Sequence, residues 1–158
     1  MKFRKLAVAL LTPTIAVSTL ALTETTAHAA GFKHKCLDPV KASDDPGGKN
    51  VTGISRREGN SAEFFQVTFL AKGEKIRIWD RRDADGTPGP KFNVEVIDRT
   101  KGKTWRRPFA GGYDASGVYD LGPDKIGQSG NIKEGHKMAV LISTAGGGTT
   151  GTCKGGVS

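Results

Sequence analysis

Residues 63–71 read Glu-Phe-Phe-Gln-Val-Thr-Phe-Leu-Ala, and this stretch carries the pattern that decides the fold. Phe65, Val67 and Phe69 alternate with the polar residues between them. Side chains return to the same face every second residue in a strand, but about every 3.6 residues in a helix. The alternation therefore predicts a half-buried β-strand over residues 63–71.

The same period of two recurs along the chain, separated by Gly-rich turns such as Lys72-Gly73-Glu74. It predicts further strands over residues 75–80, 92–96, 104–109, 118–121 and 137–144, with residues 51–56 as a candidate seventh. Short strands joined by such turns, without a helical period, indicate an all-β fold. We expect an antiparallel β-sandwich, Ig-like or jelly-roll, of about six to eight short strands.

Two regions lack this pattern. Residues 30–50 are expected to be irregular, with one short helical turn that Asp38 caps and Pro39 begins. The Gly-rich run over residues 146–151 fits a disordered segment.

The start of the chain follows the order of an export signal. Basic residues at positions 2, 4 and 5 precede an apolar run over residues 6–22, and Ala27-His28-Ala29 provides the small side chains of a cleavage site. A membrane anchor is the weaker alternative, because a spanning helix needs about 20 apolar residues and this run contains Pro13. We predict a secretion signal peptide over residues 1–29, and one β-sandwich domain with a Gly-rich C-terminal segment over residues 30–158.

Cleavage after Ala29 leaves 129 residues (158 minus 29), which carry 21 basic and 15 acidic residues and all 22 glycines. The predicted mature protein is therefore a basic, secreted, extracellular protein of one domain. Its two cysteines, Cys36 and Cys153, are expected to form one disulfide bond. A metal or nucleophile role for them is disfavoured, because the sequence shows no companion ligands beside this widely separated pair.

Basic pairs with nearby tryptophans suggest a binding surface. The pattern places Trp79 on the solvent side of its strand with Arg77, while Trp105 precedes Arg106 and Arg107. An exposed indole stacks on sugars or bases, and arginine adds hydrogen bonds to anions. The candidate ligand-binding residues are therefore Trp79, Trp105, Arg77, Arg106 and Arg107. For each tryptophan alone, packing against the core is the favoured alternative, and a plain soluble surface is favoured for the arginines.

No metal or cofactor is expected. Asp80, Asp83 and Asp85 resemble calcium ligands, but the EF-hand spacing fails because Arg81 would occupy the first ligand position. A hairpin loop with turn-forming aspartates is the favoured interpretation.

Two alternative functions remain open, although no catalytic residue is assigned. Glu63, Arg77 and His136 could serve a small ribonuclease, but the long helix that packs on such a sheet is absent from the pattern. Residues 83–90, which Pro88 and Pro90 stiffen, could serve as the loop of a protease inhibitor or another protein-directed factor.

Several short motifs recur together between residues 63 and 153. They are Phe69-x-Ala71-x-Gly73-Glu74, Asp80, Ala84-Asp85-Gly86 and Ile132-x-Glu134-Gly135. In these the chain resembles small exported β-sandwich proteins common in filamentous soil bacteria. The second cysteine usual in that group is absent, and Ile78-Trp79-Asp80 stands in its place. The resemblance implies the fold and an extracellular location, and it implies no activity.

The sequence therefore predicts a secreted, non-catalytic binding or accessory module. Its expected partner is a cell-wall carbohydrate or another anionic polymer, and nucleic acid is not expected. No membrane span is expected after the signal is removed.

Overall fold

The computed structural model describes residues 31–82, 90–109, 116–121, 132–145 and 150–158. In this part of the chain all regular structure is β-strand, and every strand pairing is antiparallel. The strands are β1 (Phe32–Cys36), β2 (Val40–Lys41), β3 (Lys49–Arg57), β4 (Asn60–Leu70), β5 (Lys75–Asp80), β6 (Phe92–Asp98), β7 (Lys103–Phe109), β8 (Gly117–Asp120), β9 (Lys137–Thr144) and β10 (Thr150–Val157). The predicted antiparallel all-β fold is confirmed.

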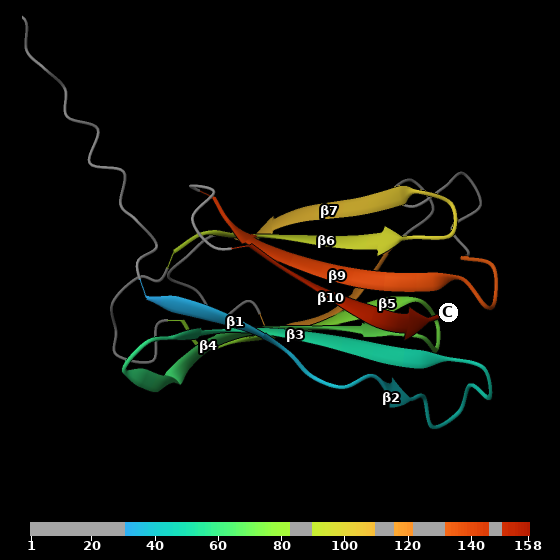
Figure 1. The fold of residues 1–158 in the computed structure, drawn as a ribbon, viewed down its shortest axis with the longest axis horizontal. Coiled ribbons are helices and arrows are strands. Elements are labelled where there is room, and N and C mark those ends of the chain that lie inside the picture. Colours follow the sequence, from blue (N-terminus) through green and yellow to red (C-terminus); the bar gives the residue numbers. More distant parts are fainter. Residues whose placement is uncertain (1–30, 83–89, 110–115, 122–131, 146–149) are drawn as a thin grey trace, which may run out of the picture.

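The strands lie in two facing layers (Figure 1). One layer contains β1, β3, β4, β5 and β8, and the other contains β7, β6, β9 and β10. The layers are continuous along one side, because the start of β3 pairs with the end of β10 at Lys49 and Val157. The hydrogen-bonded order is thus β7-β6-β9-β10-β3-β4-β5-β8, a sheet curled so that its two halves face each other.

The described residues form ten strands where about six to eight were expected, because β1, β2 and β10 lie in the segments that lacked a clear pattern. The expected helical turn at Asp38 and Pro39 is wrong, since both residues lie in the extended connection between β1 and β2. The disorder expected for residues 146–151 is wrong at Thr150 and Gly151, which belong to β10, while residues 146–149 lie outside the described residues. A Cβ on Gly156 would press on Val51 and Met138, so this glycine permits close packing of backbones rather than disorder.

The core lies between the two layers. The inward residues of β4 (Phe65, Val67 and Phe69) meet those of β6 and β9, and all of them are buried. The Phe65 and Phe92 rings stack with centroids 5.0 Å apart and so join the layers directly. The alternation in residues 63–71 therefore has the predicted cause, which is burial of one face of each strand.

A buried arginine connects the layers at one end of the core. Arg82 follows β5 and is only 1% exposed. Its Nε donates a hydrogen bond to Asp80 Oδ1 over 2.7 Å, and its two terminal nitrogens contact Asp80 Oδ2 and the Pro90 carbonyl. The guanidinium also lies 4.6 Å from the centre of the Phe65 ring. Arg82 therefore adds nothing to the positive charge of the surface, because its charge is neutralised inside the protein.

The predicted disulfide is present between Cys36 in β1 and Cys153 in β10, with Cα atoms 5.3 Å apart. It joins strands from opposite layers across a sequence separation of 117 residues. His34 lies beside the sulfur atoms, and its partial burial lowers its pKa because desolvation disfavours the imidazolium.

We predict that Arg82→Ala lowers the free energy of unfolding by about 3–5 kcal/mol, because it leaves the Asp80 carboxylate buried without its counter-charge. Urea denaturation measures this loss. Arg81→Ala is the matched control, since Arg81 is exposed and its loss should cost no more than about 0.5 kcal/mol. Equal denaturation midpoints for Arg82→Ala and the parent protein would contradict the structural role of this pair.

Candidate functional site

The outer face of the layer containing β5 carries a row of paired residues that ends at an exposed tryptophan and includes one buried member, Ile54. Trp79 is 50% exposed, which agrees with its solvent side in the alternation. The favoured interpretation of core packing is therefore wrong for this tryptophan. Strand register places Gln66 of β4 opposite Trp79, Ile54 opposite Gln66, and Lys35 of β1 opposite Ile54. Residues paired across an antiparallel sheet lie on the same face, so this row crosses four strands.

The neighbouring rows position Trp79 and surround it with polar groups. The Phe64 ring meets the indole edge-on, with centroids 5.1 Å apart, which restricts the orientation of Trp79. On the other side, register sets Arg77 between Thr68 and the exposed Val118. The aromatic face of Trp79 and the guanidinium of Arg77 are thus held on one flat surface.

An open hollow of about 380 Å³ lies on this face. It is lined by Gln66, Thr68, Arg77, Ile78, Trp79, Ser116, Gly117 and Val118. Amide, hydroxyl and guanidinium groups here flank an indole. This combination can stack a sugar ring and hydrogen-bond its substituents.

The same face carries several cations. Two of them have carboxylate partners: Lys33 lies 3.3 Å from Glu58, and Lys75 lies 3.2 Å from Asp120. Within the described residues, Arg77 has no ion pair. Its charge is therefore available to a ligand.

The remaining candidate residues do not join this face. Trp105 is 4% exposed and packs in the core, as the favoured alternative for it predicted. It therefore cannot contact a ligand on the surface. Arg106 lies on the outer face of the opposite layer, paired with Glu95 at 2.7 Å. Arg107 covers the Tyr119 ring at 4.4 Å, where β7 approaches β8. Of the five candidate ligand-binding residues, the structure brings together only Trp79 and Arg77.

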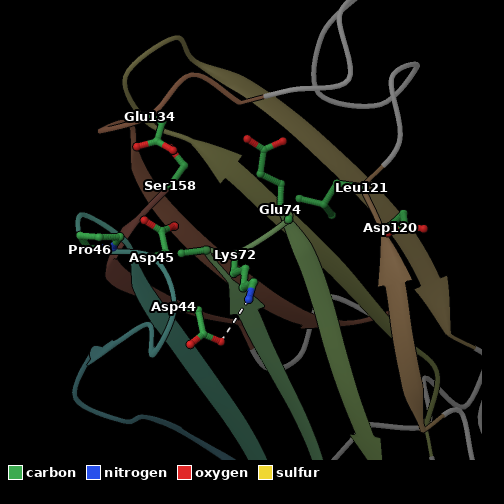
Figure 2. A pocket seen from close by; sticks show the side chains of 11 residues that line it. Asp44, Asp45, Pro46, Lys72, Glu74, Asp120, Leu121, Glu134 and Ser158 are labelled. Carbon is green, nitrogen blue, oxygen red and sulfur yellow. Dashed lines mark hydrogen bonds and ion pairs between the residues drawn. The ribbon is translucent and has the colours of Figure 1, made fainter.

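Sequence reasoning missed an acidic pocket of about 480 Å³ at the end of the sandwich. Its carboxylates come from four segments that are widely spaced in sequence: Asp44 with Asp45, Glu74, Asp120 and Glu134. Figure 2 shows these side chains around the pocket, with Lys72 reaching Asp44 over 3.1 Å. This lysine lowers the pKa of Asp44 through its hydrogen bond and its charge.

Glu74 is a second carboxylate of this pocket with a shifted pKa, and its shift is upward. It closes the turn between β4 and β5, where its N–H donates to the Ala71 carbonyl over 3.1 Å. Partial burial raises the pKa of Glu74, and the charge of Glu134 raises it further, although a hydrogen bond from the Ile132 backbone opposes the shift.

The calcium candidates do not form a site in the described residues. Both oxygens of Asp80 are engaged by Arg82 in the buried pair, which explains Asp80 without a cation. Asp83 and Asp85 lie outside the described residues, as does the proposed inhibitor loop except for Pro90.

The ribonuclease candidates are also separated. Glu63 is buried and bonds Arg57 at 2.7 Å near the β3–β4 turn. His136 lies at the opposite end of the sandwich, because the register places neighbouring Lys137 beside Val157 and Val157 beside Lys49. Its Nδ1 lies 2.7 Å from Asp98, so this histidine does have an orienting carboxylate. Glu63, Arg77 and His136 cannot act on one substrate from these positions.

Comparisons with family models, with curated proteins and with solved structures found no match for this chain. The resemblance to small exported β-sandwich proteins therefore stays a prediction. Among the described residues there is no helix with the length and apolar character of a membrane span.

We predict that Glu74→Gln raises the melting temperature at pH 7 by about 1–2 °C and leaves it unchanged near pH 3. The folded protein raises the pKa of Glu74, so this group favours folding below its unfolded pKa, and that stability is lost as the pH rises through its folded pKa. Glutamine cannot ionise and avoids that loss. Calorimetry at both pH values measures the effect.

Glu58→Gln is the control, because Glu58 pairs with Lys33 on the exposed surface. It should give no gain at pH 7. A lower melting temperature for Glu74→Gln than for the parent at pH 7 would contradict the direction of the Glu74 shift.

Proposed function

We propose that the chain is a secreted, non-catalytic binding module whose Trp79 face binds an anionic polysaccharide of a cell envelope. The observation that carries this proposal is the half-exposed indole of Trp79, held edge-on by Phe64 beside Arg77 in an open hollow. A large aromatic side chain is usually buried. Its exposure beside polar groups is typical of a ligand-binding surface.

The chemistry of the hollow fits a sugar. The C–H face of a pyranose ring packs on a flat indole, while Gln66 and Thr68 can hydrogen-bond ring hydroxyls. Arg77 supplies two parallel N–H donors that match a carboxylate or phosphate substituent. The ligand class is therefore a glycan with acidic groups.

The shape and charge of the face favour a polymer over a small molecule. The Trp79 row crosses β5, β4, β3 and β1, so a chain of sugars that starts on Trp79 and Gln66 can pass over the buried Ile54 to Lys35. Lys35 and Arg56 extend the positive charge beyond the hollow in that direction. Several weak contacts along one polymer add up to useful affinity.

Secretion is part of the same proposal. The export-signal pattern of residues 1–29 supports it, and a disulfide between Cys36 and Cys153 fits an oxidising compartment. An envelope glycan is the anionic polymer that an exported protein meets.

We predict that Trp79→Ala weakens binding to a carboxylated or phosphorylated cell-wall polysaccharide by about tenfold or more, because aromatic stacking contributes about 1–3 kcal/mol. Arg77→Ala should weaken it about fivefold and reduce its salt dependence. Affinity electrophoresis or calorimetry with the purified polysaccharide measures both changes, and a neutral polysaccharide tests the requirement for acidic groups.

Arg106→Ala is the matched control, because this exposed arginine lies on the opposite face. It should bind like the parent, and all three variants should keep the parent melting temperature within about 2 °C. Equal affinity of Trp79→Ala and the parent for the acidic polysaccharide would overturn the proposal.

A further inference from the structure

The disulfide has a third potential metal ligand beside it. His34 and Cys36 both lie in β1, two residues apart and therefore on one face of the strand. The Nε2 atom of His34 lies 3.2 Å from Cys153 Sγ and 3.8 Å from Cys36 Sγ. We call these three residues the His34 cluster, and all their ligand atoms lie within 4.8 Å of one another.

Two glycines make room for the imidazole. A Cβ on Gly151 of β10 would collide with the His34 ring, and a Cβ on Gly53 of β3 would lie 3.1 Å from Cys153 Sγ and 3.2 Å from His34 Cε1. Glycine weakens a strand interior, so its presence there marks a close approach of another group. The strands on both sides of the ring are thus shaped to hold it against the sulfur atoms.

The second nitrogen of the imidazole also has a partner. His34 Nδ1 lies 3.4 Å from the hydroxyl of Ser55, which is buried. When Nδ1 carries the ring proton and donates it to Ser55 Oγ, Nε2 keeps the lone pair, which lies on the side of the sulfur atoms. Metal-binding histidines usually have such a second contact, which fixes the ring orientation.

We propose that the His34 cluster, once its disulfide is reduced, is a binding site for a thiophilic metal ion, with Zn²⁺ as the best fit. A tetrahedral site with Zn–S bonds of about 2.3 Å and Zn–N bonds of about 2.05 Å needs sulfur–nitrogen separations of about 3.5 Å. The two separations present, 3.2 and 3.8 Å, lie on either side of that value.

Only the sulfur–sulfur separation must change. It has to open from a covalent bond to about 3.8 Å, the edge of a tetrahedron with Zn–S bonds of about 2.3 Å. Cys36 is exposed whereas Cys153 is fully buried, so rotation of the Cys36 side chain can supply this movement. The exposed side of the cluster leaves the fourth position to water.

The exchange balances in electrons and protons. A dithiol reductant gives two electrons and two protons to the disulfide, which becomes two thiols while the reductant closes to its own disulfide. Zn²⁺ then replaces the two thiol protons, which pass to solvent, and bonds both sulfurs and Nε2. The metal would link β1 to β10 in place of the covalent bond.

The test uses the purified chain reduced with a water-soluble phosphine, which takes oxygen from water and ends as the phosphine oxide. Cobalt(II) serves as the optical probe for Zn²⁺. We expect one Co²⁺ per reduced chain, with a thiolate charge-transfer band and the visible bands of tetrahedral cobalt, and no such bands for the oxidised chain. Added Zn²⁺ should raise the melting temperature of the reduced chain, because it binds the folded state.

His34→Gln tests the ligand, with Lys35→Gln in the same strand as the control. The His34 variant should bind Co²⁺ about 100-fold more weakly or worse, since loss of a direct ligand costs at least as much as loss of an outer-sphere partner. Lys35→Gln should bind like the parent. Ser55→Ala, which leaves all three ligands in place, should bind about tenfold more weakly with its thiolate band retained.

Three results would overturn the proposal. They are absence of the thiolate–cobalt band in the reduced parent, equal Co²⁺ affinity of His34→Gln and the parent, and a Zn²⁺-induced fall in the melting temperature of the reduced parent. The last result would mean that the metal prefers the unfolded chain.

Discussion

The buried guanidinium of Arg82 is the constraint on which the arrangement of the two layers depends. It follows β5 in one layer, neutralises Asp80, and donates to the Pro90 carbonyl where the chain enters the other layer. A buried arginine is costly unless its charge and donors are satisfied. The position that satisfies them also places it against the Phe65 and Phe92 rings. The layers therefore have one relative position at this end of the core.

The packing of the core determines which side chains lie on the outer surface. In β5 the inward residues Ile76, Ile78 and Asp80 are committed to the interior, so Arg77 and Trp79 must face solvent. Pairing with β4 then sets Gln66 and Thr68 beside them. The same strand alternation therefore gives both surfaces: its inward residues form the core, and its outward residues form the proposed glycan-binding face.

Glycine acts differently at the proposed metal site, because it leaves space where a side chain would not fit. In β10 it replaces side chains that would collide with neighbouring groups: Gly151 faces the His34 ring, and Gly156 faces Val51 and Met138. The close approach lets one imidazole contact both sulfurs of the disulfide. The His34 cluster joins β1 to β10, whereas Trp79 lies in β5. The two proposals therefore depend on different residues and can fail separately.

The strands with strict alternation, the antiparallel all-β class and the Cys36–Cys153 bond could be predicted from the amino-acid sequence, because burial of one face and pairing of the only two thiols are local or compositional constraints. The alternation also placed Trp79 on the solvent side of its strand, although core packing was the favoured interpretation for each tryptophan alone. The sequence pattern could not show that Trp105 and Arg82 are buried, that Arg106 and Arg107 lie away from Trp79, or that His34 contacts the sulfur atoms. Those outcomes depend on which strands become neighbours across the two layers, and strand order follows from packing between segments distant in sequence.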